Sequence, residues 1–161
     1  MIERFCVWLE TLPWAVSISQ SGWLFPSIET VHVLALTMVV GSIAMVDLRL
    51  LNLAYRDRTV RQLTEEVLPW TWMAFVVAAI FGTLLFASAA TKYSSIASFQ
   101  VKLVLLGLAG FNMLFFHFLP YRKVDEWGGL HQTTQTAKFC GGLSLLLWIG
   151  IVALGRWTGF A

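Results

Sequence analysis

Residues 27–54 read SIETVHVLALTMVVGSIAMVDLRLLNLA, and this stretch decides the fold. Its apolar centre has the length of a helix that crosses a hydrocarbon core about 30 Å thick, for which roughly 20 residues are needed. The polar residues lie at the two ends, Glu29 and His32 near the start and Asp47 and Arg49 near the end. The pattern predicts a membrane-spanning helix with a different chemical group at each end.

The composition of the whole chain agrees with a membrane protein. Of the 161 residues, 58% are hydrophobic and 12% are charged, whereas a soluble domain carries about 25% charged residues. The mean hydropathy is +0.73, and a soluble domain of this length cannot build a core large enough to hide so much apolar surface. The net charge of +2 is too small for the basic face that binds nucleic acid.

Three further apolar segments have the length of a span. Residues 1–26 precede the four apolar segments. Their pattern predicts a short amphipathic helix at the membrane interface, which Pro13 ends and interfacial tryptophans follow. The predicted fold class is therefore all-α: a four-helix transmembrane bundle with a short N-terminal interfacial helix, forming one membrane domain over residues 1–161. The expected spans cover residues 27–54, 69–91, 99–119 and 137–157.

The basic residues predict an orientation. Seven of the 11 Lys and Arg residues fall in or beside the connections that follow the first and third expected spans. Because basic residues favour the cytoplasmic side of short connections, these two connections are expected in the cytoplasm. Both termini are then expected on the periplasmic side of a bacterial inner membrane, as part of a multi-pass protein.

Ionisable side chains within spans cost about 2.5–3.5 kcal/mol each on insertion scales, which makes each a candidate for function. Glu29 and His32 share one face of the first helix, with Asp47 five turns further along it. A single Glu-x-x-His pair is too little for a di-iron site, which needs a second pair and two more carboxylates. Met113 and His117, four residues apart in the third span, form a possible soft-metal pair for Cu(I), although methionine on an apolar helix face is more often packing.

The expected topology separates the two intramembrane histidines. His32 lies near one face of the membrane and His117 near the other, about 24 Å apart, so the two cannot bind the same iron. Haem b would then occupy two layers or use only one histidine, with His131 as an available partner for His117. The charge partners expected near the His32 site are Glu29, Lys102 and Arg156.

The same residues also have structural explanations. Buried charges in membranes usually find partners, so Glu29 would pair with a basic residue such as Lys102, and Asp47 with one such as Arg49. His32 would hydrogen-bond to a neighbouring helix. Small residues recur at helical spacing on every span, where they allow close helix packing or leave room for a flat cofactor.

Several short segments, spread over the whole chain, carry a resemblance to an uncharacterised family of small bacterial four-helix inner-membrane proteins, a domain of unknown function. That resemblance implies the architecture and a bacterial origin, and no activity. More coarsely, the chain is similar to small b-type membrane cytochromes and copper-resistance membrane proteins, which place histidines in facing pairs as this chain does not. The segments are residues 23–26 (WLFP), 28–30 (IET), 32–33 (HV), 40–43 (VGSI), 47–51 (DLRLL), 69–72 (PWTW) and 155–157 (GRW).

These observations lead to three hypotheses. The first is an integral membrane redox protein that holds haem b or another metal cofactor, with His32, His117 and Met113 as metal ligands and copper as the alternative metal. The second is a non-catalytic membrane subunit or assembly factor that docks a partner in a larger complex or forms a homo-oligomer. The third is a permease for a small solute or metal ion. The signatures HExxH, GxSxG and the P-loop are absent, so no reaction is assigned.

Overall fold

The computed structural model describes residues 2–130 and 132–159, and these residues are mostly helical and contain no strand. Helix makes up 85% of the structure. Four helices are long and apolar enough to cross a membrane, consistent with a multi-pass membrane protein. The predicted fold class is thereby confirmed. The long helices are α3 (Leu24–Leu50), α4 (Val60–Ser88), α6 (Ala97–Phe118) and α8 (Gln135–Thr158).

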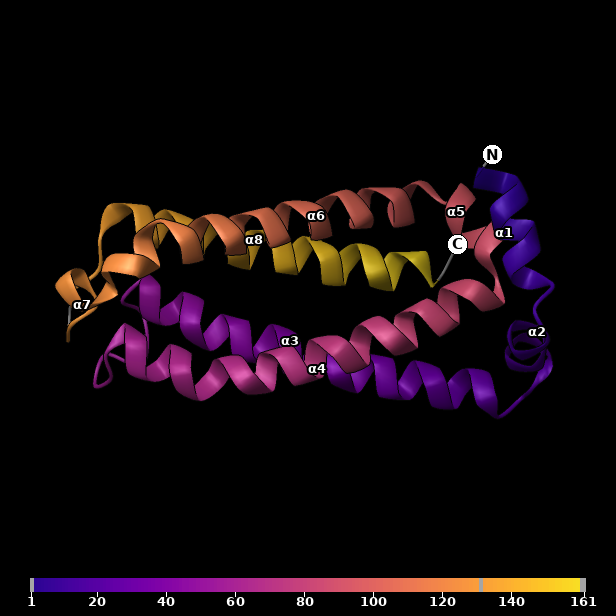
Figure 1. The fold of residues 1–161 in the computed structure, drawn as a ribbon, viewed down its shortest axis with the longest axis horizontal. Helices are drawn as coiled ribbons and strands as arrows, with labels where there is room; N and C mark the ends of the chain where they lie inside the picture. The colour runs from indigo at the N-terminus through magenta and orange to yellow at the C-terminus, as the bar shows by residue number, and fades with distance from the viewer. Residues whose placement is uncertain (1, 131, 160–161) are drawn as a thin grey trace.

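The four long helices form two pairs that run side by side (Figure 1). Helix α3 packs along α4, α6 packs along α8, and α3 also contacts α8, whereas α4 and α6 lie on the side where the pairs do not close on each other. The connections 51–59 and 119–134 lie at one end of the bundle, called here the loop end. The opposite end, where both termini lie, is called the terminal end.

Three short helices cover the terminal end (Figure 1). Pro13 stands at the first position of α2, where its missing N–H costs nothing, and so divides the N-terminal segment into two helices. A carboxylate oxygen of Glu10 accepts a hydrogen bond from the backbone N–H of Thr91 at 2.7 Å, which ties the first helix to α5. The short N-terminal helix expected from the sequence is present. These helices are α1 (Ile2–Glu10), α2 (Pro13–Gln20) and α5 (Ala90–Ser95).

The loop end differs from the expected boundaries. Residues 60–68, expected in a polar connection, form the first turns of α4, and Pro69 lies inside that helix. A capping box starts the helix: the Thr59 hydroxyl accepts from the Gln62 N–H at 3.2 Å, and the Gln62 side chain accepts from the Thr59 N–H at 3.1 Å. Helix α3 ends earlier than expected, at Leu50, because Asn52 adopts a left-handed φ of 58°.

A buried arginine joins the two connections at the loop end. The Arg49 side chain is fully buried, and its guanidinium donates to the Arg58 carbonyl at 2.7 Å and to the Gly129 carbonyl at 2.9 Å. It also donates to the Asn52 side-chain oxygen at 2.9 Å. The expected ion pair with Asp47 is not formed among the described residues, because positions 47 and 49 point to different faces of α3.

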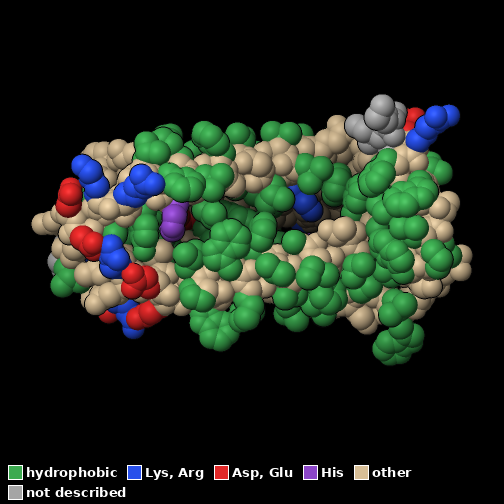
Figure 2. Space-filling view, in the orientation of Figure 1, with side chains coloured by type: hydrophobic (Ala, Val, Ile, Leu, Met, Phe, Trp, Pro, Cys, Tyr) green, Lys and Arg blue, Asp and Glu red, His purple; other side chains and the backbone are tan. Residues whose placement is uncertain are grey.

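Charged side chains gather at the loop end, while apolar side chains cover most of the visible face (Figure 2). The exposed guanidinium of Arg61 in α4 bonds both carboxylate oxygens of Asp125 at 2.6 Å. Asp125 belongs to the short helix α7 (Val124–Trp127), which follows the 3-10 turn η1 (Pro120–Lys123). This charge pattern is typical of a bundle whose charged end lies in water and whose middle lies in lipid.

Candidate functional site

A cavity of about 390 Å³ lies among the four long helices, in the half of the bundle nearer the loop end. That volume is within the range of small-molecule sites. The cavity is bordered by α4 and α6, the two helices that do not close against each other. Figure 2 shows the molecule hollowed between the two helix pairs on this face. The cavity therefore borders the lipid-facing side of the bundle.

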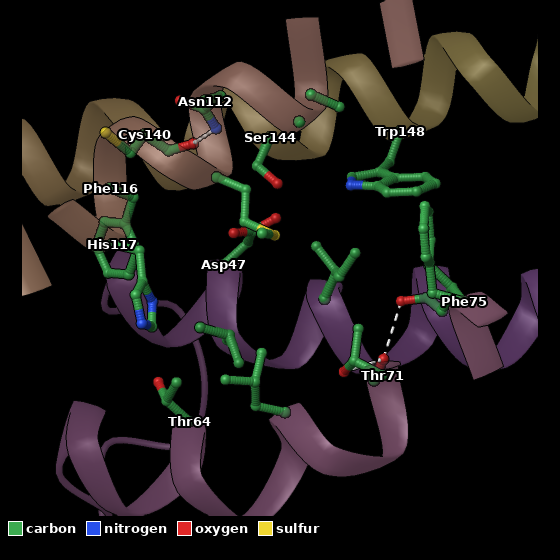
Figure 3. Close-up of a pocket in the computed structure, with 18 of the residues that line it drawn as sticks. Asp47, Thr64, Thr71, Phe75, Asn112, Phe116, His117, Cys140, Ser144 and Trp148 are labelled. Atoms are coloured by element: carbon green, nitrogen blue, oxygen red, sulfur yellow. Dashed lines mark hydrogen bonds between the residues drawn. The ribbon is translucent and has the colours of Figure 1, made fainter. Parts of the chain in front are cut away.

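Each long helix contributes a polar side chain to one end of the cavity. These are Asp47 from α3, Thr64 from α4, His117 from α6 and Ser144 from α8. Ser144 points toward Asp47, and the ring of His117 points toward Thr64 (Figure 3). The four side chains form a polar end, which would meet the polar part of a bound molecule.

Two oxygens at this polar end have no hydrogen-bond partner. Asp47 and Thr64 are each only 5% exposed, and Oδ2 of Asp47 and Oγ1 of Thr64 are the buried side-chain atoms of the described residues that stay unpaired. Leaving such a group unpaired costs about 1–3 kcal/mol. Both residues line the same cavity, so a molecule bound there would lie beside both unpaired groups.

The other half of the cavity is apolar and aromatic. The indole of Trp148 in α8 is 8% exposed and lies near the ring of Phe75 from α4 (Figure 3). Val39 of α3 and Ala109 of α6 belong to the same buried cluster as Trp148. This wall would pack against the apolar body of a molecule whose polar head lies at Asp47 and Thr64.

Other polar groups of the cavity wall are occupied in holding the helices together. The Asn112 side chain of α6 donates to the Cys140 carbonyl of α8 at 3.0 Å. The Thr71 hydroxyl of α4 donates to the Ser42 hydroxyl of α3 at 2.8 Å. Interhelical bonds of this kind stabilise membrane bundles. These groups are satisfied by the chain itself, which distinguishes them from Asp47 and Thr64.

Of the residues predicted from the sequence, Asp47, Met113 and His117 line the cavity, and the last two lie one turn apart on α6. The imidazole of His117 stacks on the Tyr121 ring, with 4.9 Å between the ring centroids. His131, expected as the partner of His117, lies outside the residues that the structure describes.

His32 lies in the other half of the bundle and does not line the cavity. Its Nδ1 donates to the Ala78 carbonyl of α4 at 2.9 Å. Gly82 leaves room for the ring, since a Cβ at that position would lie 2.8 Å from Cε1 of His32. His32 thus forms the expected hydrogen bond to a neighbouring helix. Its contact at Ala78 and the position of Thr64 beside His117 are about 21 Å apart along α4, so the two imidazoles lie in different layers.

The remaining predicted residues lie toward the terminal end. Glu29 and Arg156 are exposed, and Lys102 is half-buried. No ion pair forms between Glu29 and Lys102, both of which the structure describes. Burial raises the pKa of the Tyr93 phenol in α5, and the nearby negative charge of Glu29 adds to this rise. None of these residues lines the cavity.

Metal coordination would depend on few donors. Within residues 2–130 and 132–159, no three His, Cys, Asp or Glu side chains gather in one place as a metal ion would require. The cavity brings together one imidazole, one thioether and one carboxylate, from His117, Met113 and Asp47. Met113 and His117 come from the same face of one helix, so both would approach a bound group from the same side.

Three of the cavity residues on which the site depends were not predicted from the sequence as site residues. Thr64 lies in a segment expected to be a polar connection, and Ser144 and Trp148 lie in the fourth span without a charge to mark them. Ser144 and Trp148 are four residues apart, which places both on one helix face, and that spacing was the available signal. Thr64 gave no signal without the correct start of α4.

Fold and cavity together define a multi-pass α-helical membrane protein with an internal cavity beside its open, lipid-facing side. The chain belongs to the family of unknown function DUF6644, whose model matches residues 7–161. This confirms the predicted membership of an uncharacterised family. The comparison with curated proteins found no match, and neither did the comparison with solved structures.

Proposed function

We propose that the protein binds a small amphipathic molecule that reaches the cavity from the lipid phase. One observation carries the proposal: the two unpaired buried side-chain oxygens belong to Asp47 and Thr64, two residues that line the same cavity. Buried polar groups in native proteins are nearly always paired, so each exception calls for an explanation. A ligand head that bonds both oxygens supplies one.

The chemistry of the two oxygens limits the head group. An ionised carboxylate only accepts hydrogen bonds, whereas a threonine hydroxyl both donates and accepts. A head that carries an ammonium or a hydroxyl group would donate to Asp47 and still bond Thr64. Since charge-assisted bonds are about twice as strong as neutral ones, the ammonium is the better match. Trp148 and Phe75 favour an aromatic body.

Three probes that share one apolar body test this proposal: 2-naphthylmethylamine, 2-naphthalenemethanol and 2-methylnaphthalene. Calorimetric titration into the protein in lipid nanodiscs is expected to show the amine binding most tightly and the hydrocarbon least. Asp47→Asn should weaken binding of the amine about tenfold or more, because a hydrogen bond to a charged group contributes roughly 1.5–3 kcal/mol. Binding of the hydrocarbon should not change.

A matched acid controls for charge. Glu29 is an exposed carboxylate at the start of the same helix, and Glu29→Gln should leave all three affinities unchanged. Empty nanodiscs give the partition of each probe into lipid. Equal affinity for the three probes, or loss of amine binding in both variants alike, would rule out the proposed site.

Haem b in the same cavity is the second candidate, favoured by the position of His117 and Met113 on its wall. The His117 imidazole would hold the iron, and Met113 lies on the same helix face. Bound haem would supply electron transfer; Trp148 and Phe75 would pack on its apolar faces. A red protein with a Soret band that His117→Ala weakens, and His32→Ala does not, would support haem. A colourless protein with no iron or copper by elemental analysis would dismiss it.

We also propose that the loop end faces the cytoplasm of a bacterial inner membrane. The support is the excess of Lys and Arg in the two connections at that end. A cysteine introduced at exposed Asp57 should then react with an impermeant maleimide only after the cells are opened, and labelling in intact cells would reverse the orientation. The hypotheses of a partner-docking subunit and of a permease remain predictions.

A further inference from the structure

A half-buried lysine lies on the terminal side of the cavity, outside it. Lys102 is six residues into α6, so its Cα lies about 8 Å inside the start of that helix. Its ammonium lies 5.5 Å from the centroid of the Phe99 ring, within reach of a cation–π interaction. A lysine at this depth extends its charge toward the membrane surface, where lipid headgroups lie.

The surroundings of Lys102 are ordered. The Phe99 ring stacks on Phe86 of α4, with 5.4 Å between centroids and 5° between planes, and it also contacts Tyr93. On the other side, Gly155 of α8 faces the lysine, since a Cβ there would lie 3.8 Å from Nζ. The ammonium thus lies between the Phe99 ring, which packs against two further aromatic rings, and a small residue of α8.

The charge of Lys102 has no carboxylate partner among the described residues. Glu29 is the acidic residue expected to pair with it, and that pair is not formed. Charged groups within membranes usually find a counter-charge. At the depth of the headgroups, the abundant counter-charge is the phosphate of a lipid.

We propose that Lys102 binds the phosphate of an anionic phospholipid, whose acyl chains lie along the exposed apolar faces of α4 and α6. An anionic headgroup is preferred to a zwitterionic one, because the latter carries its own ammonium beside the phosphate. The lipid site is separate from the cavity that holds Asp47, and it does not depend on the function proposed for that cavity.

Native mass spectrometry of the delipidated protein tests the site. Phosphatidylglycerol and phosphatidylcholine with identical acyl chains are titrated, and the wild-type chain should prefer phosphatidylglycerol about fivefold, the effect of one basic residue at a membrane surface. Lys102→Gln should remove the preference, and Lys102→Arg should keep it. Lys92→Gln is the matched control, since Lys92 is an exposed lysine of α5 at the same end.

Two further ligands distinguish the source of the negative charge. Oleate offers a carboxylate on an acyl chain, and inorganic phosphate offers the anion without a chain; both should bind more weakly than phosphatidylglycerol. The proposal is overturned if Lys102→Gln keeps the lipid preference, if Lys92→Gln loses it equally, or if oleate or phosphate binds as tightly. Asp47→Asn should leave lipid binding unchanged, so the test of the lipid site is independent of the test of the cavity with the naphthyl probes.

Discussion

The two histidines in the long helices occupy opposite halves of the bundle and have different surroundings. His32 is hydrogen-bonded to the Ala78 carbonyl and fitted against Gly82. His117 lines a cavity, with Thr64 opposite and Tyr121 stacked beneath it. Both residues are ionisable side chains in apolar helices, and that property alone does not identify function. Whether the chain itself satisfies the side chain separates a structural residue from a candidate site.

The same distinction holds between Asp47 and Arg49, two positions apart on α3. Both are ionisable residues, and both are buried. Arg49 donates to four oxygens of the two connections, whereas Asp47, which lines the cavity, keeps an unpaired oxygen. We therefore expect substitutions at the satisfied positions to change stability, and substitutions at the unsatisfied ones to change binding.

Arg49→Gln should have the largest effect on stability. The shorter side chain cannot reach the Arg58 and Gly129 carbonyls together, and it leaves buried acceptors without donors. The expected loss is about 3–5 kcal/mol of the free energy of unfolding, the range for breaking a buried charged network. Unfolding in mixed detergent, followed by circular dichroism, measures it. Arg122→Gln, at an exposed arginine of the same end, should change stability little; equal losses would contradict the role given to Arg49.

Substitutions of two glycines compare the packing in the two halves of the bundle. Gly82→Ala places a Cβ 2.8 Å from the His32 ring and should cost about 1–3 kcal/mol through overpacking. Gly110→Ala, on the cavity wall, meets nothing within 4 Å and should be neutral, or stabilising by up to about 1 kcal/mol because the unfolded chain loses freedom. Thermal unfolding of both variants in one detergent gives the comparison, and a reversed order would refute the distinction between the halves.

The sequence was sufficient for the fold because each span is defined by its own residues. The apolar centre of residues 27–54 and the three later segments have the length that lipid requires, and the helices are where that length predicts. The boundaries were less predictable. Helix α4 starts at a capping box at Thr59. Residues 60–68 contain several polar side chains, and this composition indicated a connection instead of a helix.

The candidate site could be predicted only in part. His117 and Met113 were found because an imidazole and a thioether four residues apart stand out in an apolar span. Thr64 and Ser144 were missed because an uncharged hydroxyl in a helix commonly bonds its own backbone. Whether the Thr64 hydroxyl is paired depends on the packing of α4 against the other three helices, which no local pattern in the sequence records.

Substitutions of two threonines of α4 should have the smallest effects on stability, and they compare a paired hydroxyl with an unpaired one. Thr71 and Thr64 are seven residues apart and both line the cavity, but only Thr71 donates to a neighbouring helix, at Ser42. Thr71→Val should therefore cost about 1 kcal/mol, the net contribution of one hydrogen bond. Thr64→Val removes an unpaired hydroxyl with little change of volume, so stability should stay the same or rise by about 1 kcal/mol.

The affinity for the probe should depend on the other threonine of the pair. Thr64→Val removes an oxygen that the ligand head would bond, so the affinity for 2-naphthalenemethanol should fall about fivefold, the equivalent of one neutral hydrogen bond. Thr71→Val should leave that affinity unchanged. Stability and affinity are measured on the same two preparations: Thr71→Val should lower only the stability, and Thr64→Val should lower only the affinity. If Thr64→Val destabilises the protein as much as Thr71→Val does, the Thr64 hydroxyl is part of the packing and not of a binding site.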